Sequence, residues 1–313
     1  MKTRNLFTAT ILVLAITFLA SCSNDDDATY GDEKSQTNFY MTDAPTDNSN
    51  VKGVIVTVAD IKVNGVSLEG FTKTTIDLMQ YQNGMTKLLG NLELNTGTYS
   101  NISILLDNET DESGNAPGSY VLFTDGSSQA VATTTNQINI NDSFEILAST
   151  TNDIVFDFDI RKSLVFDTNG TFKFVSTSEL SNSIRVINKE KSSDISGNAS
   201  DPENTSDKII VYAYEKGKYN ANTEESEQGS GVTFSHAVTS SVVSNISGSY
   251  ELNFLEEGEY ELHFVSYTDN DNNGEFEFNG ELMAESITGA DLNNISINSS
   301  LNLNIAVTLK TKS

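Results

Sequence analysis

The spacing of the apolar residues is the strongest constraint on what this chain can fold into. From about residue 38 to the end, apolar and polar residues alternate in short segments bounded by Asn, Asp, Gly, Ser and Thr; Val54, Val56 and Val58 are one example. A period of two places such residues on one face of a β-strand. Short helices are expected only around Met79 to Leu89 and near Arg161. The sequence therefore predicts an all-β protein.

Two segments depart from simple alternation. The apolar parity changes around Ala59 and Asp60, which predicts a β-bulge or a bend. Residues 209–214 are apolar or aromatic at every position, which is typical of a strand covered on both faces.

The length of 313 residues favours two domains, since a domain averages roughly 150 residues. Residues 189–207 contain almost nothing to bury, so we expect a linker there. The predicted fold is two β-sandwich domains in tandem, at residues 38–188 and 208–313, behind a flexible lipidated tether.

The N-terminus has the layout of a secretory signal: Lys2 and Arg4, then an apolar run from Leu6 to Leu19, then small residues. The segment Leu19-Ala20-Ser21-Cys22 resembles the bacterial lipobox, in which cleavage precedes a cysteine acylated on sulfur. Residues 1–21 are then a signal peptide, and Cys22, the one cysteine of the chain, carries a covalent lipid such as palmitate. An ordinary secretory signal is the alternative.

Residues 22–37 are polar and acidic and are expected to form a tether. The run Ser23-Asn24-Asp25-Asp26-Asp27 resembles the signal that sends Bacteroidetes lipoproteins to the outside of the outer membrane. A simple solvated tether facing the periplasm is the alternative. The membrane partner is expected to be reached through the lipid anchor.

The first domain resembles a bacterial family called domain of unknown function 4382. The resemblance rests on residues 40–45 (YMTDAP), 76–78 (IDL), 97–99 (GTY) and 155–164 (VFDFDIRKSL), and it spans about residues 38–188. It implies a β-sandwich in an envelope lipoprotein and no catalytic residue.

The second domain resembles transthyretin-like modules related to carboxypeptidase regulatory domains. The resemblance rests on residues 248–252 (GSYEL) and 255–262 (LEEGEYEL), with Gly258 in a turn and Tyr260 opening a strand. The proline usual in that turn is absent. Such modules act as spacers or binding supports.

The composition excludes several classes of function. With 44 Asp and Glu against 18 Lys and Arg, the formal charge is −26, which repels nucleic acid. Two histidines, His236 and His263, and the absence of tryptophan leave few of the groups that enzymes use. We expect no enzymatic activity.

The best candidate for a site is the loop of residues 269–277 (DNDNNGEFE). Oxygen ligands at alternate positions, then a glycine, follow the logic of a calcium-binding loop. The candidate metal ligands are Asp269, Asp271, Asn273, Glu275 and Glu277. Gly280 stands where an EF-hand requires glutamate, so a site inside a β-hairpin is expected, with affinity of about 10⁻⁴ to 10⁻³ M. An empty polar turn is the alternative, because the same residues form ordinary turns.

Other acidic residues are interpreted structurally. Asp157 and Asp159 share a strand parity with Arg161, which favours a solvated row of ion pairs over acid–base chemistry. Asp43 and Asp47 flank Pro45, which favours turn capping. Residues 107–112 are expected to form a solvated acidic loop.

Together these features predict a surface-exposed outer-membrane lipoprotein that acts as a non-catalytic binding, adhesion or scaffold module, with an unidentified protein or glycan partner. A carbohydrate-binding or carbohydrate-processing accessory protein is the alternative; the missing tryptophan removes the strongest sugar-stacking side chain.

The outward orientation predicts that proteinase added to intact cells degrades the protein, because the acidic tether places both domains outside the outer membrane. Immunoblotting of treated cells measures this. Protein left intact while a known surface protein is digested would contradict the exterior assignment.

Overall fold

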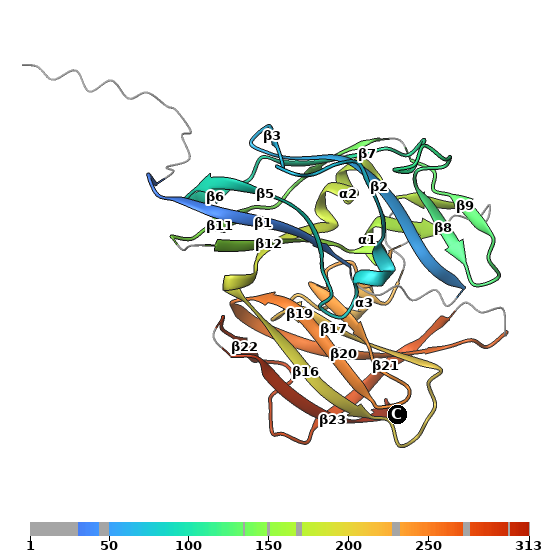
Figure 1. Cartoon of the computed structure of the whole chain (residues 1–313). Helices are drawn as coiled ribbons and strands as arrows, with labels where there is room; N and C mark the ends of the chain where they lie inside the picture. The colour runs from blue at the N-terminus through green and yellow to red at the C-terminus, as the bar shows by residue number, and fades with distance from the viewer. Residues whose placement is uncertain are drawn as a thin grey trace, which may run out of the picture.

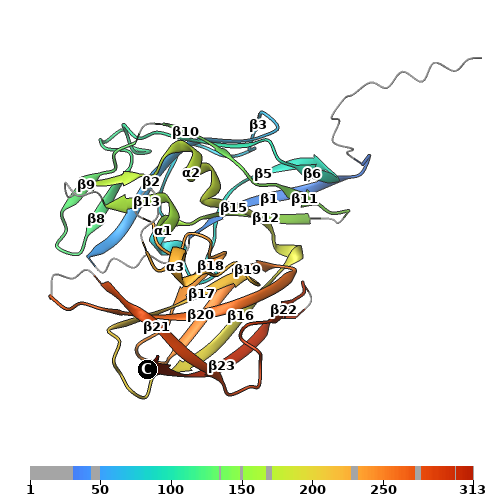
Figure 2. The same cartoon turned by 180° about the vertical axis from the view of Figure 1, so that it is seen from behind.

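The computed structural model describes residues 31–43, 50–133, 135–148, 151–166, 171–226, 232–271, 276–299 and 301–312. It is nearly all β, as predicted, with two β-domains in tandem (Figures 1 and 2). Cys22, Asp47, Asn273 and Glu275 lie outside the described residues. In the part of the chain that is described, no helix is long and apolar enough to span a bilayer.

The first domain is built on two sheets. The smaller sheet has the order β15 (Ile184–Asn188), β12 (Thr151–Phe158), β1 (Lys34–Thr42) and β5 (Lys87–Asn95), with β1 and β12 parallel. The larger has the order β10 (Gln137–Ile140), β7 (Ile102–Leu106), β2 (Val51–Val63), β8 (Tyr120–Phe123) and β9 (Ser128–Ala130), with β3 (Val66–Ser67) and β4 (Thr74–Asp77) also on β2. Apolar residues of both sheets, such as Phe39 and Val56, form one core.

Smaller elements complete this domain. They are η1 (Leu78–Tyr81), α1 (Ile160–Ser163), α2 (Thr177–Asn182), and the two-stranded pairs β6 (Gly97–Tyr99) with β11 (Phe144–Ile146) and β13 (Leu164–Phe166) with β14 (Phe172–Phe174). The helix expected near Arg161 is present as α1, but the one expected around Met79 to Leu89 is confirmed only at η1, since β5 begins at Lys87. Helix α2 is an addition, begun by a capping box between Ser176 and Glu179. The bulge predicted around Ala59 and Asp60 is present where β2 pairs with β7.

The second domain is one sheet that curls around its core. Its order is β18 (Thr239–Val242), β17 (Lys208–Glu215), β20 (Gly258–Thr268), β21 (Glu277–Ser286), β23 (Leu303–Thr311), β16 (Ser192–Ser200) and β19 (Ser249–Glu256), with β22 (Ile295–Ile297) on β20. The edge strands β18 and β19 contact each other: the N–H of Glu251, in β19, donates to Ser241 Oγ, in β18, at 3.0 Å. Two short helices, η2 (Lys189–Lys191) and α3 (Ala221–Glu224), lie outside the sheet.

The linker expected at residues 189–207 is wrong for most of its length. Residues 192–200 form β16, which lies between β19 and β23. Its inward positions are mostly small, and Gly197 is necessary because a Cβ there would meet the carbonyl oxygen of Ile305 at 1.9 Å. Tyr250 packs beside Gly197 and donates its hydroxyl to the same oxygen. Because Tyr250 covers this strand, β16 needs few apolar residues of its own, and its sequence therefore shows no strand pattern.

The expected boundary between tether and domain also shifts. Strand β1 begins at Lys34, inside the segment 22–37 assigned to the tether, and Ser35 and Thr37 are buried in it. By contrast, β17 is covered on both faces as predicted: Val211 lies in the core of the curled sheet, and Tyr212 lies in a second apolar cluster on its outer face.

A tyrosine closes a chain corner in each domain. The hydroxyl of Tyr99 donates to the carbonyl oxygen of Asn95, and the hydroxyl of Tyr260 donates to that of Glu256, both at 3.0 Å. Each tyrosine lies two residues after a glycine, Gly97 or Gly258, that begins a new strand. The Gly-x-Tyr pattern in both halves thus has the same physical role, which is to anchor a buried ring to the preceding strand end.

We predict that Tyr260→Phe lowers the free energy of unfolding by about 1 kcal/mol, because it removes one buried hydrogen bond and leaves the ring in place. Urea denaturation measures the change. The matched variant Tyr120→Phe, at a half-buried tyrosine whose hydroxyl makes no hydrogen bond within the described residues, is expected to change it by less than about 0.5 kcal/mol. Equal effects would contradict the anchoring role.

Candidate functional site

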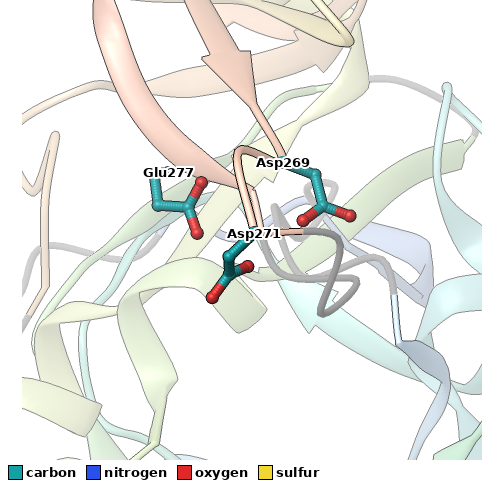
Figure 3. A group of neighbouring side chains, drawn as sticks. All are labelled: Asp269, Asp271 and Glu277. Carbon is teal, nitrogen blue, oxygen red and sulfur yellow. The ribbon is translucent and has the colours of Figure 1, made fainter.

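The acidic hairpin loop brings three of the five predicted metal ligands together. Asp269, Asp271 and Glu277 each offer a carboxylate oxygen, and these oxygens lie within 4.8 Å of one another (Figure 3). Glu277 opens β21 directly opposite Thr268, the last residue of β20. The hairpin register therefore places the ninth position of the loop opposite the residue that precedes the first.

Hydrogen bonds hold the two arms of the loop. The N–H of Asn270 donates to Glu277 Oε2 at 3.1 Å, and the N–H of Asp269 donates to Asp207 Oδ2 at 3.0 Å. Converging carboxylate oxygens without nitrogen or sulfur ligands suit a hard cation such as Ca²⁺. Polar turns adopt similar bonds without any ion.

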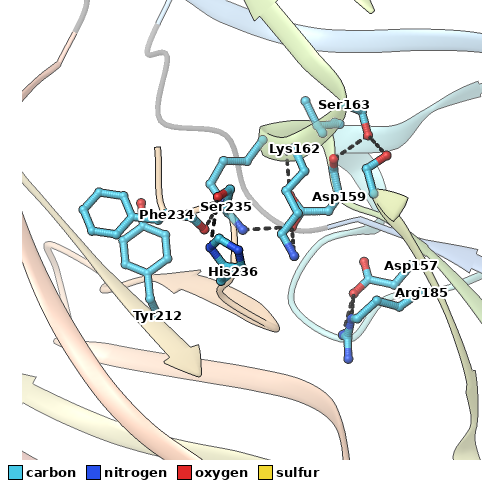
Figure 4. Close-up of polar contacts among 12 residues, drawn as sticks. Asp157, Asp159, Lys162, Ser163, Arg185, Tyr212, Phe234, Ser235 and His236 are labelled. Carbon is cyan, nitrogen blue, oxygen red and sulfur yellow. Dashed lines mark hydrogen bonds and ion pairs between the residues drawn. The ribbon is translucent and has the colours of Figure 1, made fainter. Parts of the chain in front are cut away.

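A second group of charged residues lies where the two domains meet (Figure 4). Asp157, on β12, accepts from Arg185, on β15, at 2.6 Å, and its side chain is 5% exposed. Arg185 also donates to the carbonyl oxygen of Phe254, at 3.2 Å, in β19 of the second domain. One ion pair of the first domain thus contacts the backbone of the second.

The neighbouring pair repeats this arrangement. Asp159 accepts from Arg161 at 2.9 Å, and both side chains are 3% exposed. Arg161 donates to the carbonyl oxygen of Phe234 at 2.5 Å, and its guanidinium lies 5.4 Å from the ring centre of Tyr212. The solvated row of ion pairs expected from the sequence is therefore wrong in its exposure: the second domain covers these charges.

The two phenylalanines that accept these bonds have unusual backbones. Phe234 and Phe254 have φ values of +50° and +57°, in the left-handed region that large side chains rarely adopt. Each conformation presents a carbonyl oxygen to an arginine of the other domain, and the N–H of Phe254 donates to Asp194. The backbone strain is thus located where the domains contact each other.

Burial changes the ionisation of two groups beside these pairs. It raises the pKa of Asp43 well above the ordinary value, although Gln82 and the N–H of Ile160 donate to this carboxylate. It lowers the pKa of Lys162 to about 8 despite the nearby Asp159. Asp43 thus accepts from the first N–H of α1, a distant contact, while the turn at Pro45 that it was expected to cap lies outside the described residues.

The two histidines contact carboxylates. His236 Nδ1 lies 2.6 Å from Oε1 of the fully buried Glu224 and 3.3 Å from Ser235 Oγ. A serine–histidine–acid relay needs the serine and the acid on opposite ring nitrogens, whereas here both contact Nδ1. Ser235, His236 and Glu224 therefore lack the geometry of a nucleophilic triad. His236 lies in a turn.

His263 lies between acidic residues on the curled sheet. Its Nδ1 is 2.7 Å from Glu281 Oε1, and its ring stacks on Tyr219 with centroids 3.7 Å apart. Burial acts to raise the pKa of Glu281, but hydrogen bonds from His263 and Lys312 lower it overall. These contacts pack the 216–226 segment against β20 and β21.

The acidic segment 107–112 is less open than predicted. Asp107 pairs with Lys73 at 2.6 Å, and this hydrogen bond is the main reason that the pKa of Asp107 falls to about 2. The sequence did not point to Arg185 or Glu224. Arg185 pairs with Asp157, 28 residues earlier in the chain, and contacts Phe254 of the other domain, and Glu224 pairs with His236, 12 residues later. No local motif signals such pairs.

We predict that Arg161→Met lowers the free energy of unfolding by about 3 kcal/mol, because Asp159 is left as a poorly compensated buried charge. Chemical denaturation measures the loss, and adding Asp159→Asn is expected to recover part of it. Lys34→Met, which breaks an ion pair whose side chains are 58% and 60% exposed, is the control and is expected to cost less than about 1 kcal/mol. Similar costs for both variants would contradict a buried junction.

Three solved structures are remote likenesses of this chain. The Bacillus anthracis TIE protein is 11% identical with a TM-score of 0.18, and the match covers 88% of this chain but only 34% of that one. BcpA, the major pilin subunit of Bacillus cereus, is 9% identical with a TM-score of 0.22, covering 89% of this chain and 71% of that one. The shaft pilin spaA from Lactobacillus rhamnosus GG is 11% identical with a TM-score of 0.21, covering 89% and 100%. TM-scores this low support no argument about function.

No curated protein matches the chain. A family model does match: residues 34–176 fit the family described as Domain of unknown function (DUF4382). The match covers most of the first domain, in agreement with the resemblance expected for residues 38–188, and somewhat less than half of the whole chain. The first domain is thus similar to a family without an assigned activity.

Proposed function

We propose that this protein is an outer-membrane lipoprotein, anchored through Cys22 and facing the cell exterior, that acts as a non-catalytic binding, adhesion or scaffold module. The observation that carries the proposal is the use of buried charged groups at the domain junction. Asp157, Asp159, Arg161 and Arg185 are committed to one another and to the backbone of the second domain. Such contacts suit a rigid support better than a reaction centre.

The proposed cellular location rests on the sequence. The lipobox-like segment ending at Cys22 and the acidic run after it support lipid attachment and export. The resemblance of the C-terminal half to transthyretin-like modules belongs to the same proposal, since modules of that kind act as spacers or binding supports. No nucleic-acid partner is proposed, because of the formal charge of −26.

A carbohydrate-binding role is the second candidate. It is favoured by a polar cleft in the second domain that is lined by asparagines, serines and two aspartates, without a lysine, arginine or histidine among its described lining residues. A pull-down with purified residues 23–313 as bait separates the candidates. Saturable retention of one protein partner from an envelope extract favours the adhesion or scaffold role, and saturable binding to one polysaccharide favours the second. Turnover of a substrate that is lost on Asp157→Asn would overturn both.

Calcium in the acidic hairpin loop is the third element of the proposal. Asp269, Asp271 and Glu277 would hold the ion, and Asn273 and Glu275 complete the predicted ligand set. An ion there neutralises converging carboxylates and stiffens the hairpin between β20 and β21. It has no catalytic part in this proposal.

We predict that millimolar Ca²⁺ raises the melting temperature of the protein, because an ion that binds only the folded state stabilises it. Calorimetry measures the shift, which the double variant Asp269→Ala/Asp271→Ala should abolish. The control Asp111→Ala/Glu112→Ala removes the same charge from another loop and should keep the response. An unchanged melting temperature, or an identical shift in the Asp269→Ala/Asp271→Ala variant, would refute the site.

A further inference from the structure

A cleft of about 550 Å³ lies at one end of the second domain, between the end of β16, the 201–207 segment and the 243–248 turn. We call it the amide cleft. Its polar lining includes Asn198, Ser200, Asp201, Asn204, Asp207 and Asn245. The volume lies within the range of about 300 to 1,000 Å³ that is usual for sites of small ligands.

Several polar groups in the amide cleft are available for a ligand. The side chains of Asn198, Ser200 and Asn204 make no hydrogen bond within the described residues and line the open space. Asp201 uses one oxygen to accept from the N–H of Asn204 at 3.2 Å, and Asn245 donates to the carbonyl oxygen of Asp207 at 3.2 Å. Hydrogen bonds of Asp201 and Asn245 therefore hold the backbone around the cleft, while the side chains of Asn198, Ser200 and Asn204 are open to a ligand.

The open cleft of the first domain provides a contrast. That cleft has a volume of about 640 Å³, and most of its polar side chains are engaged. Asn108 accepts from Ser119 and donates to the carbonyl oxygen of Thr135, and Asp107 is paired with Lys73. The side chains of Glu109 and Asn136 make no hydrogen bond within the described residues, but Glu109 is a carboxylate, whereas the three open side chains of the amide cleft are uncharged.

The lining also selects the chemical class of ligand. Among the described residues that line the cleft there is no lysine, arginine or histidine, while Asp201 and Asp207 are acidic. Phosphate, sulfate and carboxylate groups are disfavoured there, and amides, hydroxyls and carboxylates suit vicinal hydroxyl groups. The apolar residues Ile209 and Val243 also line the cleft, beside these polar groups.

We propose that the amide cleft binds a neutral oligosaccharide through Asn198, Ser200 and Asn204. This inference deepens the carbohydrate-binding candidate of the proposed function by naming its site and ligand class. Asp207 links the cleft to the acidic hairpin loop, because it accepts from the N–H of Asp269. Asp207 therefore both lines the cleft and contacts the candidate calcium loop.

The test is calorimetric titration of purified residues 23–313, which include every described residue, with neutral hexasaccharides of glucose, xylose and mannose. We expect at least one to bind at micromolar to millimolar concentration. Asn198→Ala/Ser200→Ala should weaken that binding about tenfold or more. The control Ser100→Ala/Asn101→Ala alters an exposed Ser–Asn pair in the first domain and should leave affinity unchanged.

Three outcomes would overturn the assignment: no binding of any neutral hexasaccharide, equal affinity in all variants, or preferential binding of a sulfated or uronic-acid oligosaccharide. Circular dichroism of each variant excludes unfolding as the cause of a loss. If neutral glycans fail to bind but the pull-down retains a protein partner, the cleft proposal falls and the adhesion or scaffold role stands. Failure of both experiments would remove the binding function as well.

Discussion

The relation between the two domains depends on two buried carboxylate–arginine pairs. Each arginine is held by an aspartate of the first domain and donates to a carbonyl oxygen of the second. A guanidinium can do both at once because its five N–H donors are arranged in a rigid plane. An aspartate or arginine left alone there would be costly, so the pairs and the covering domain require one another.

This constraint explains how a very acidic chain keeps charges in its interior. The formal charge of −26 is carried mainly by exposed residues, while the cations Arg161, Lys162 and Arg185 gather against the buried carboxylates. The exposed carboxylates converge at the hairpin after β20, where a hard cation would relieve their repulsion. The described lining of the amide cleft has two aspartates and no cation, and its open side chains, Asn198, Ser200 and Asn204, are uncharged hydrogen-bonding groups that suit a ligand without charge.

The features predicted from sequence are those with a local physical cause. The alternation around Val54, the bulge at Ala59 and the doubly covered strand at 209–214 follow from the period of two and from burial, and all three are present. The approach of Asp269, Asp271 and Glu277 was predictable as well, since a hairpin brings its own ends together. The strand at 192–200 escaped prediction because Gly197 and small residues pack beneath Tyr250, a partner about 50 residues away.

The sequence by itself determined that this is an all-β, acidic chain, because strand period and charge are properties of contiguous residues. Export and lipid attachment at Cys22 are proposals that rest on its N-terminal segment. Only the tertiary structure decided the burial of Asp157 and Asp159, since the surface that covers them comes from residues about 70 positions later in the chain. It also decided which polar groups remain available. Asn198 and Asn108 are the same residue type, and the difference in their hydrogen bonding arises from neighbours that the chain brings near only when it folds.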